Sequence, residues 1–269
     1  MKLVASSKLR RAQRAIEALR PYESALNDIL GSLQQAAAVT AVTDQADMDM
    51  SLKGGKTVVV ALSSNTSLCG GFNSNVIKKA LAVVSDAAAS GSVEVWSVGR
   101  KMAEAMRKAG YPTPEDCNDF VAHPSYAEVS AFATALVQRF EAGEIARILL
   151  VYNHFVSSAK QVVEVETYLD RNSSTAAAAM PEGGEVEGFL VEPSPATVVS
   201  SLQPQVLNLK MYAAVLDSIA SEHAARTVAM QTATDNAQDL LADLTLEYNK
   251  ARQAKITSEI LDLAGGAQQ

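Results

Sequence analysis

The feature that most limits how this chain can fold is its C-terminal stretch, residues 205–264, which contains neither glycine nor proline. Along it, apolar, small and a few polar residues recur at alternating steps of three and four, the a and d spacing of a coiled coil. These positions are Val206, Leu209, Ala213, Leu216, Ala220, His223, Thr227, Met230, Thr234, Ala237, Leu241, Leu244, Tyr248 and Ala251. A continuous helix here would be roughly 90 Å long, whereas globular helices rarely exceed about 20 residues. The pattern therefore predicts a rod with a narrow seam.

A second helical pattern with the same spacing lies near the N-terminus. Its positions are Leu9, Ala12, Ile16, Leu19, Glu23, Leu26, Leu30, Leu33 and Ala37. Pro21 falls inside this pattern and removes one backbone donor, so we expect a bend or a local weakness there. We expect the two rods to pair antiparallel, because a compact middle domain returns the chain close to where it left.

Between the rods, strand and helix signals alternate. Strands are predicted at residues 57–62, 92–98, 145–155 and 161–169, and helices at 73–89, 100–109 and 126–140. A short turn near Ser157 joins the last two strands, which predicts an antiparallel hairpin. Loops are predicted at residues 44–49, 53–56 and 170–187, a short strand at 189–191, and the start of the long helix near Pro195.

This order of elements predicts the α/β class. We expect residues 1–50 and 195–269 to form an antiparallel coiled-coil shaft and residues 51–194 a small foot domain. The foot is predicted to be Rossmann-like, with a partly parallel sheet, since strands alternate with helices along it.

Charge and composition narrow the classes of partner. The net charge of −7 argues against nucleic acid as the main partner. The first twenty residues are nevertheless basic: Lys2, Lys8, Arg10, Arg11, Arg14 and Arg20 are accompanied only by Glu17. This cluster fits either an acidic partner surface or a solvated helix face. No run of 18 apolar residues occurs, so no transmembrane helix is predicted, and the N-terminus lacks the apolar segment of a signal peptide.

Residues 67–73, SLCGGFN, follow a strand and open a helix, where a phosphate-binding loop could lie. Neither GxGxxG nor GxxxxGK[ST] is present, so we interpret the loop as a tight turn that needs small residues. Cys69 has no histidine near it in sequence, and the two cysteines, Cys69 and Cys117, are predicted to be free thiols. His123, His154 and His223 show no metal-ligand spacing. The sequence therefore predicts no catalytic constellation, no cofactor and no metal site.

Long strings in the C-terminal rod resemble the gamma subunit of F-type, proton-translocating ATP synthases. They are Glu222-His223-Ala224-Ala225-Arg226, Ala233-Thr234-Asp235-Asn236-Ala237 and residues 248–256. The N-terminal string KLVASSKLRRAQ, Arg20-Pro21-Tyr22 and SLCGGFNSN at residues 67–75 support the resemblance, which covers essentially the whole chain. Family members usually have about twenty residues before the position matched by Met1, so we expect about that length of helix to be absent.

The resemblance implies a non-catalytic, central-stalk rotor subunit of a rotary ATPase. The shaft would turn inside a ring of alpha and beta subunits, and the foot would bind epsilon and rest on the c-ring. Such a subunit would touch the membrane only indirectly, through the c-ring, and would be peripheral on the cytoplasmic face of the bacterial inner membrane. Rotation would couple transmembrane proton flow to ATP synthesis or hydrolysis on beta.

The resemblance also implies contact residues. Arg252, Gln253, Thr257 and Glu259 would contact beta, and Leu261 and Leu263 would lie in an apolar bearing at the tip. Arg226, Lys2, Lys8 and Arg11 would face acidic loops of beta. Two other interpretations stay open from the residues alone: a stand-alone α/β enzyme that binds a nucleotide, and a generic coiled-coil scaffold.

Overall fold

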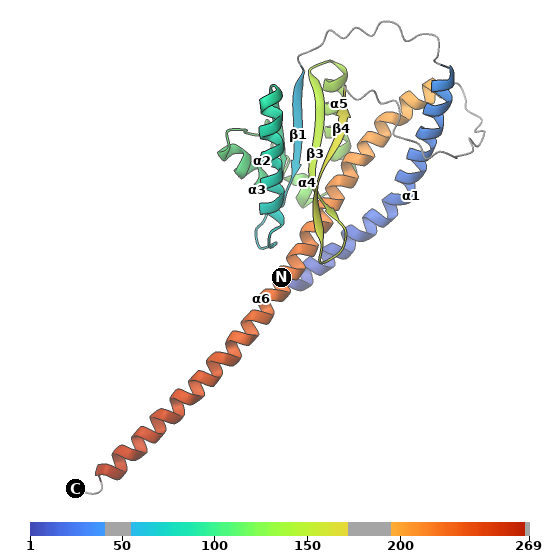
Figure 1. The fold of residues 1–269 in the computed structure, drawn as a ribbon. Coiled ribbons are helices and arrows are strands. Elements are labelled where there is room, and N and C mark those ends of the chain that lie inside the picture. Colours follow the sequence, from blue (N-terminus) through green and yellow to red (C-terminus); the bar gives the residue numbers. More distant parts are fainter. Residues whose placement is uncertain (41–54, 172–194, 267–269) are drawn as a thin grey trace.

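The computed structural model describes residues 1–40, 55–171 and 195–266, and its helices and strands confirm the α/β class (Figure 1). The helices are α1 (Lys2–Thr40), α2 (Phe72–Ser90), α3 (Arg100–Lys108), α4 (Asp119–Ala122), α5 (Tyr126–Glu141) and α6 (Pro195–Gly266). The strands are β1 (Lys56–Leu62), β2 (Val93–Val98), β3 (Ile145–Phe155) and β4 (Gln161–Asp170). The predicted loops at 44–49 and from 172 on, and the predicted strand at 189–191, lie outside the described residues.

The sheet has the strand order β2-β1-β3-β4. Strand β1 is parallel to both neighbours, so that Val59 pairs with Val95 on one side and Leu149 on the other. Strand β4 pairs antiparallel with β3, with Val151 opposite Val165. The predicted partly parallel sheet and terminal hairpin are therefore confirmed.

Alternation along β1 divides the core into two layers. Val59 and Ala61 face α2 and α3, where they pack with Val76, Met102 and Met106, all fully buried. The alternate residues Val58, Val60 and Leu62 face α5 and α6 on the other side of the sheet. Every one of these five β1 side chains is buried, which explains why the strand reads as a continuous apolar run.

Helices α1 and α6 run antiparallel, and the N-terminus lies beside the middle of α6 (Figure 1). The N-terminal seam is confirmed: Leu9, Ala12 and Leu26 are buried along α1. Helix α1 continues through Pro21 as one element. Figure 1 shows it curving along the foot, as a missing hydrogen bond near its middle allows.

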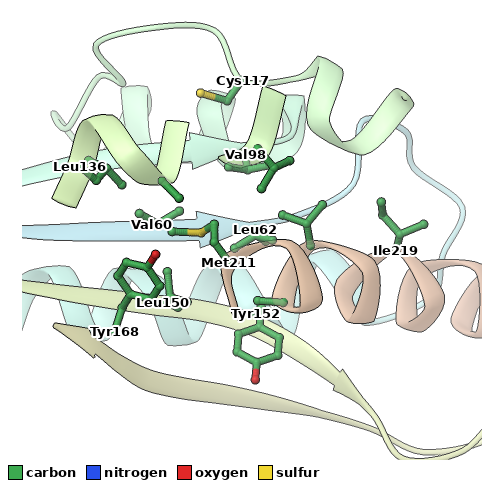
Figure 2. Close-up of a cluster of buried hydrophobic side chains, with 14 of the residues drawn as sticks. Val60, Leu62, Val98, Cys117, Leu136, Leu150, Tyr152, Tyr168, Met211 and Ile219 are labelled. Atoms are coloured by element: carbon green, nitrogen blue, oxygen red, sulfur yellow. The ribbon is translucent and has the colours of Figure 1, made fainter. Parts of the chain in front are cut away.

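Helix α6 is buried more widely than a narrow seam predicts. In addition to the seam residue Leu209, its residues Met211, Val215 and Ile219 pack against the sheet. Figure 2 shows Met211 lying among side chains of β1 and β3, including Val60. The narrow-seam prediction was wrong in this stretch, because α6 contacts α1 on one side and the sheet on another. The segments assigned to shaft and foot thus share one apolar core.

The same substitution should change the stability of the chain by very different amounts in the two halves of the α6 seam. Leu209 is 3% exposed, whereas Leu244, on the same predicted seam, is 53% exposed. We expect Leu209→Ala to lower the free energy of unfolding by about 2–5 kcal/mol, since it leaves a cavity in packed surroundings. Leu244→Ala should change it by less than about 0.5 kcal/mol in the isolated chain. Urea unfolding followed by circular dichroism measures both, and equal effects would contradict the assigned pairing.

Candidate interaction surface

The most exposed part of the fold is the C-terminal half of α6. The Lys2 ammonium donates a hydrogen bond to the Gln231 side chain, which places the start of α1 beside residue 231. Every residue of α6 from 232 to 263 is exposed. We call residues 232–263 the exposed half of α6, and Figure 1 shows it projecting away from the rest of the molecule.

The exposed half of α6 carries many large apolar side chains that are largely exposed. They are Leu240, Leu241, Leu244, Leu246, Tyr248, Ile256, Ile260, Leu261 and Leu263. Tyr248 is 66% exposed and Leu263 75%. Soluble proteins rarely expose an apolar surface of this extent unless it binds a partner. The distribution around several faces of the helix indicates a partner that surrounds it.

The predicted contact residues lie along this surface. Arg252 has no ion pair among the described residues, and Lys255 lies 3.9 Å from Glu259 in an exposed pair one turn apart. The Thr257 hydroxyl donates to the Gln253 carbonyl at 2.9 Å, as helical threonines often do. The geometry thus leaves the predicted set accessible along one continuous helix.

The other predicted cation, Arg226, is held by its own chain. Its guanidinium donates to Glu222 Oε1 at 2.6 Å and to the Thr66 hydroxyl at 2.8 Å. Its side chain is only 13% exposed. The i,i+4 spacing of Glu222 and Arg226 could have predicted this pair, but nothing in the sequence indicated that Thr66 would join it.

Arg226 lies beside two titratable groups, the buried Glu222 and the half-buried His223. Burial raises the pKa of Glu222, and the charges of Arg226 and Lys8 partly offset that rise. Burial also lowers the pKa of His223 to about 4, and the same two cations lower it further. His223 therefore carries no charge at neutral pH.

The loop after β1 is a tight turn, as its composition predicts. Leu68 and Gly70 both adopt left-handed backbone angles, with φ of 66° and 57°. The Asn73 amide donates to Ser64 Oγ at 2.8 Å and to Cys69 Sγ at 3.1 Å. Both cysteines are free and buried. The side chains of this turn therefore bond to one another.

Helix α6 crosses the place where open α/β sheets bind ligands, the carboxyl ends of the strands at the point where the strand order reverses. Here that point lies between β1 and β3, and the Ser221 hydroxyl donates to the Asn153 carbonyl of β3 at 3.0 Å. Arg226, one turn further, reaches Thr66 beyond β1. Helix α6 thus lies across the crevice that a nucleotide would need, and a cavity of about 230 Å³ remains beside the loop after β1.

A second polar cluster joins α6 to the β3–β4 hairpin, and no sequence pattern indicated it. Asp217 accepts from His154 Nδ1 at 2.5 Å and from the Phe155 backbone N–H at 3.0 Å. Lys210 pairs with Glu166 at 2.8 Å. Burial, reinforced by the Glu166 charge, raises the pKa of the nearby Glu23 carboxyl. These contacts come from residues far apart in sequence, so only the fold reveals them.

Among the residues that the structure describes, no cluster of three or more histidine, cysteine, aspartate or glutamate side chains has the geometry to hold a metal ion. None of the described helices combines the length and apolar character that crossing a membrane requires.

Comparison with known proteins identifies the family. The sequence profile described as ATP synthase matches residues 1–269. The ATP synthase gamma chain of Phocaeicola vulgatus is 44% identical over 269 residues, which is 99% of this chain and 91% of that protein. The gamma chain of Bacteroides thetaiotaomicron is 41% identical over 280 residues, covering 100% of this chain and 92% of that protein.

The chain belongs to the ATP synthase gamma chain family.

Solved structures of ATP synthases share the fold of this gamma-family chain. A chain from the central stalk and c-ring of the Tetrahymena thermophila mitochondrial enzyme is 22% identical, with a TM-score of 0.59. The alignment covers 87% of this chain and 97% of that one. A rotor chain of the Euglena gracilis mitochondrial ATP synthase is 20% identical with a TM-score of 0.54, covering 93% and 99%. The resemblance to this family stated from the sequence is therefore confirmed.

The buried histidine of this gamma-family chain predicts a pH effect. Because the folded-state pKa of His223, about 4, lies below its ordinary value of 6.5, His223 contributes stability above pH 6.5 that is lost as the pH falls towards 4. We expect His223→Gln to reduce the loss of unfolding free energy between pH 6.5 and 4.5 by about 1–2 kcal/mol. His123→Gln, at an exposed position, is the control. Denaturant titrations across this range measure it, and an unchanged slope in His223→Gln would contradict the assignment.

Proposed function

We propose that this chain is the central-stalk rotor subunit of a bacterial F-type ATP synthase, which couples proton flow across the membrane to ATP synthesis or hydrolysis by rotation. The observation that carries the proposal is the exposed half of α6, a single helix with apolar side chains on several faces. A bare helix of this kind is marginal in water. A surrounding ring of partner subunits would bury it while leaving it free to turn.

Transmission of torque needs a rigid connection between foot and shaft. Helix α6 supplies it, because one continuous helix runs from the core of the foot to the tip. Within the foot, Met211, Val215 and Ile219 anchor the helix to the sheet. A turning force applied to the foot would thus reach the exposed half of α6 through packed side chains, which deform little.

We propose that Arg252, Gln253, Thr257 and Glu259 contact the beta subunits, and that Leu261 and Leu263 lie in an apolar bearing at the tip. All six are exposed. Many modest contacts suit a turning shaft better than a few strong ones, because a deep energy minimum would lock one orientation. Lys2, Lys8 and Arg11 would face acidic loops of beta. Arg226 would act there mainly by supporting its neighbours, since its own partners are internal.

In this proposal no catalytic step takes place on the chain itself, and ATP is made or hydrolysed on beta. The alpha and beta subunits would enclose the shaft, while epsilon and the c-ring would bind the foot. The subunit would be peripheral, on the cytoplasmic face of the inner membrane, and would reach the membrane only through the c-ring. Helix α6 lies across the carboxyl ends of β1 and β3, where such an enzyme would bind its nucleotide, and this argues against a stand-alone nucleotide enzyme.

Co-expression of the full chain with the alpha and beta subunits of the same bacterium tests the proposal. We expect a stable complex whose ATPase activity depends on this chain, together with protection of the exposed half of α6 from proteolysis. Calorimetry of the isolated chain should detect no saturable ATP site. A soluble, monomeric chain that binds ATP and does not bind alpha and beta would overturn the proposal.

The double variant Arg252→Ala, Gln253→Ala should impair the complex without unfolding the foot. We expect roughly a 3- to 10-fold loss of ATPase activity, equivalent to about 1 kcal/mol of lost contact energy. Arg107→Ala removes the same charge from an exposed position on α3 and is the control. Turnover of the reconstituted complex measures both, and wild-type activity in the double variant would remove these two residues from the proposed interface.

A further inference from the structure

A cavity of about 510 Å³ lies between α1, α6 and the loops that follow β1 and α4. Its wall carries Lys8 and Arg11 from α1, His223 and Arg226 from α6, and His123 from the segment after α4. We call it the basic cavity. Its donors come from three separate parts of the chain, so only the folded molecule brings them together.

The basic cavity carries an excess of positive charge. Lys8, Arg11 and Arg226 contribute three cations, and Glu222 is the one carboxylate among the residues that line it. Glu222 already accepts from Arg226 at 2.6 Å. Neither Lys8 nor Arg11 forms an ion pair with any described residue. Lys8 and Arg11, one turn apart on α1, therefore leave the cavity with a net positive charge, since Glu222 is the one carboxylate against three cations.

Hydrogen-bond donors also converge there. The Thr66 hydroxyl accepts from Arg226 and keeps its own hydrogen to donate. His223 is neutral at pH 7, since burial and the charges of Arg226 and Lys8 lower its pKa to about 4. Together with Lys8 and Arg11, the Thr66 hydroxyl therefore offers a donor to an acceptor-rich ligand.

We propose that the basic cavity binds a small phosphate-type oxyanion, held by Lys8 and Arg11 of α1 against the Arg226 side of α6. A tetrahedral anion with several acceptor oxygens can accept from an ammonium, a guanidinium and a hydroxyl at once. Inorganic phosphate is small enough to enter a cavity of this volume together with water.

The anion would reversibly connect α1 and α6, the two helices of the shaft. Bound phosphate would neutralise repulsion among the cations and connect α1 to α6 close to the point where α6 leaves the foot. Binding only to the folded chain raises its stability by mass action. Occupancy of the basic cavity is therefore measurable as thermal stabilisation that depends on two named side chains.

The test is thermal unfolding of the full chain at pH 7 with 0–50 mM inorganic phosphate, at constant ionic strength held with sodium chloride. We expect a saturable rise in the unfolding midpoint of about 3 °C at a tenfold excess over Kd. Arg11→Gln and Lys8→Gln should each abolish most of that rise. Arg10→Gln, which removes the same charge from a neighbouring exposed position outside the cavity, should retain it.

A site-specific readout accompanies this experiment. Proton NMR of the three histidines, assigned with His223→Gln, should show a saturable shift of the His223 signal on addition of phosphate. A linear, non-saturating response, an equal response to chloride, or an unchanged response in Arg11→Gln would each overturn the proposal. A response to a carboxylate-rich peptide, with none to phosphate, would also overturn the proposal. None of these results would bear on the rotor function, which rests on the exposed half of α6.

Discussion

The burial of residues 209–224 of α6 between α1 and the β-sheet is the interaction on which the rest of this structure depends. Met211, Val215 and Ile219 belong to the same apolar cluster as Val60 of β1 and Leu9 of α1. One stretch of helix therefore completes the core of the foot and pairs the shaft. Because the free energy that folds the foot also fixes the axle, the shaft cannot rotate relative to the foot without unfolding the core.

Small residues allow α1 and α6 to pack closely enough to form a narrow shaft. Ala12 of α1 and Ala214, Ala220 and Ala224 of α6 are buried in the shared cluster, and alanine allows helices to approach closely without losing helix propensity. Polar contacts then fix the register, because Asp217 bonds to both His154 and the Phe155 backbone of the hairpin. Apolar packing holds α6 against the hairpin, and these directional hydrogen bonds determine where along α6 the hairpin lies.

Most of the fold could be predicted from the periodicity of the sequence. The steps of three and four located α1 and α6, and the β-branched run at residues 57–62 located β1, since each pattern reflects burial on a definite face. The second buried face of α6 was missed because Met211, Val215 and Ile219 fall between seam positions. The four-residue helix α4 is too short to show a period. The resemblance named the contact residues of the exposed half of α6. The bond from Arg226 to Thr66, however, joins residues 160 positions apart, so no local pattern encodes it.

The position of α6 also bears on what this α/β domain can bind. The strand order places a crevice at the carboxyl ends of β1 and β3, where such sheets generally bind ligands. In this chain, Ser221 and Arg226 of α6 occupy that edge with hydrogen bonds to the residues around it. Helix α6 thus lies where an enzyme of this topology would bind its substrate. Basic side chains remain at its margin, and the basic cavity lies there, at the neck of the shaft, where an anion would act on the joint between the two parts.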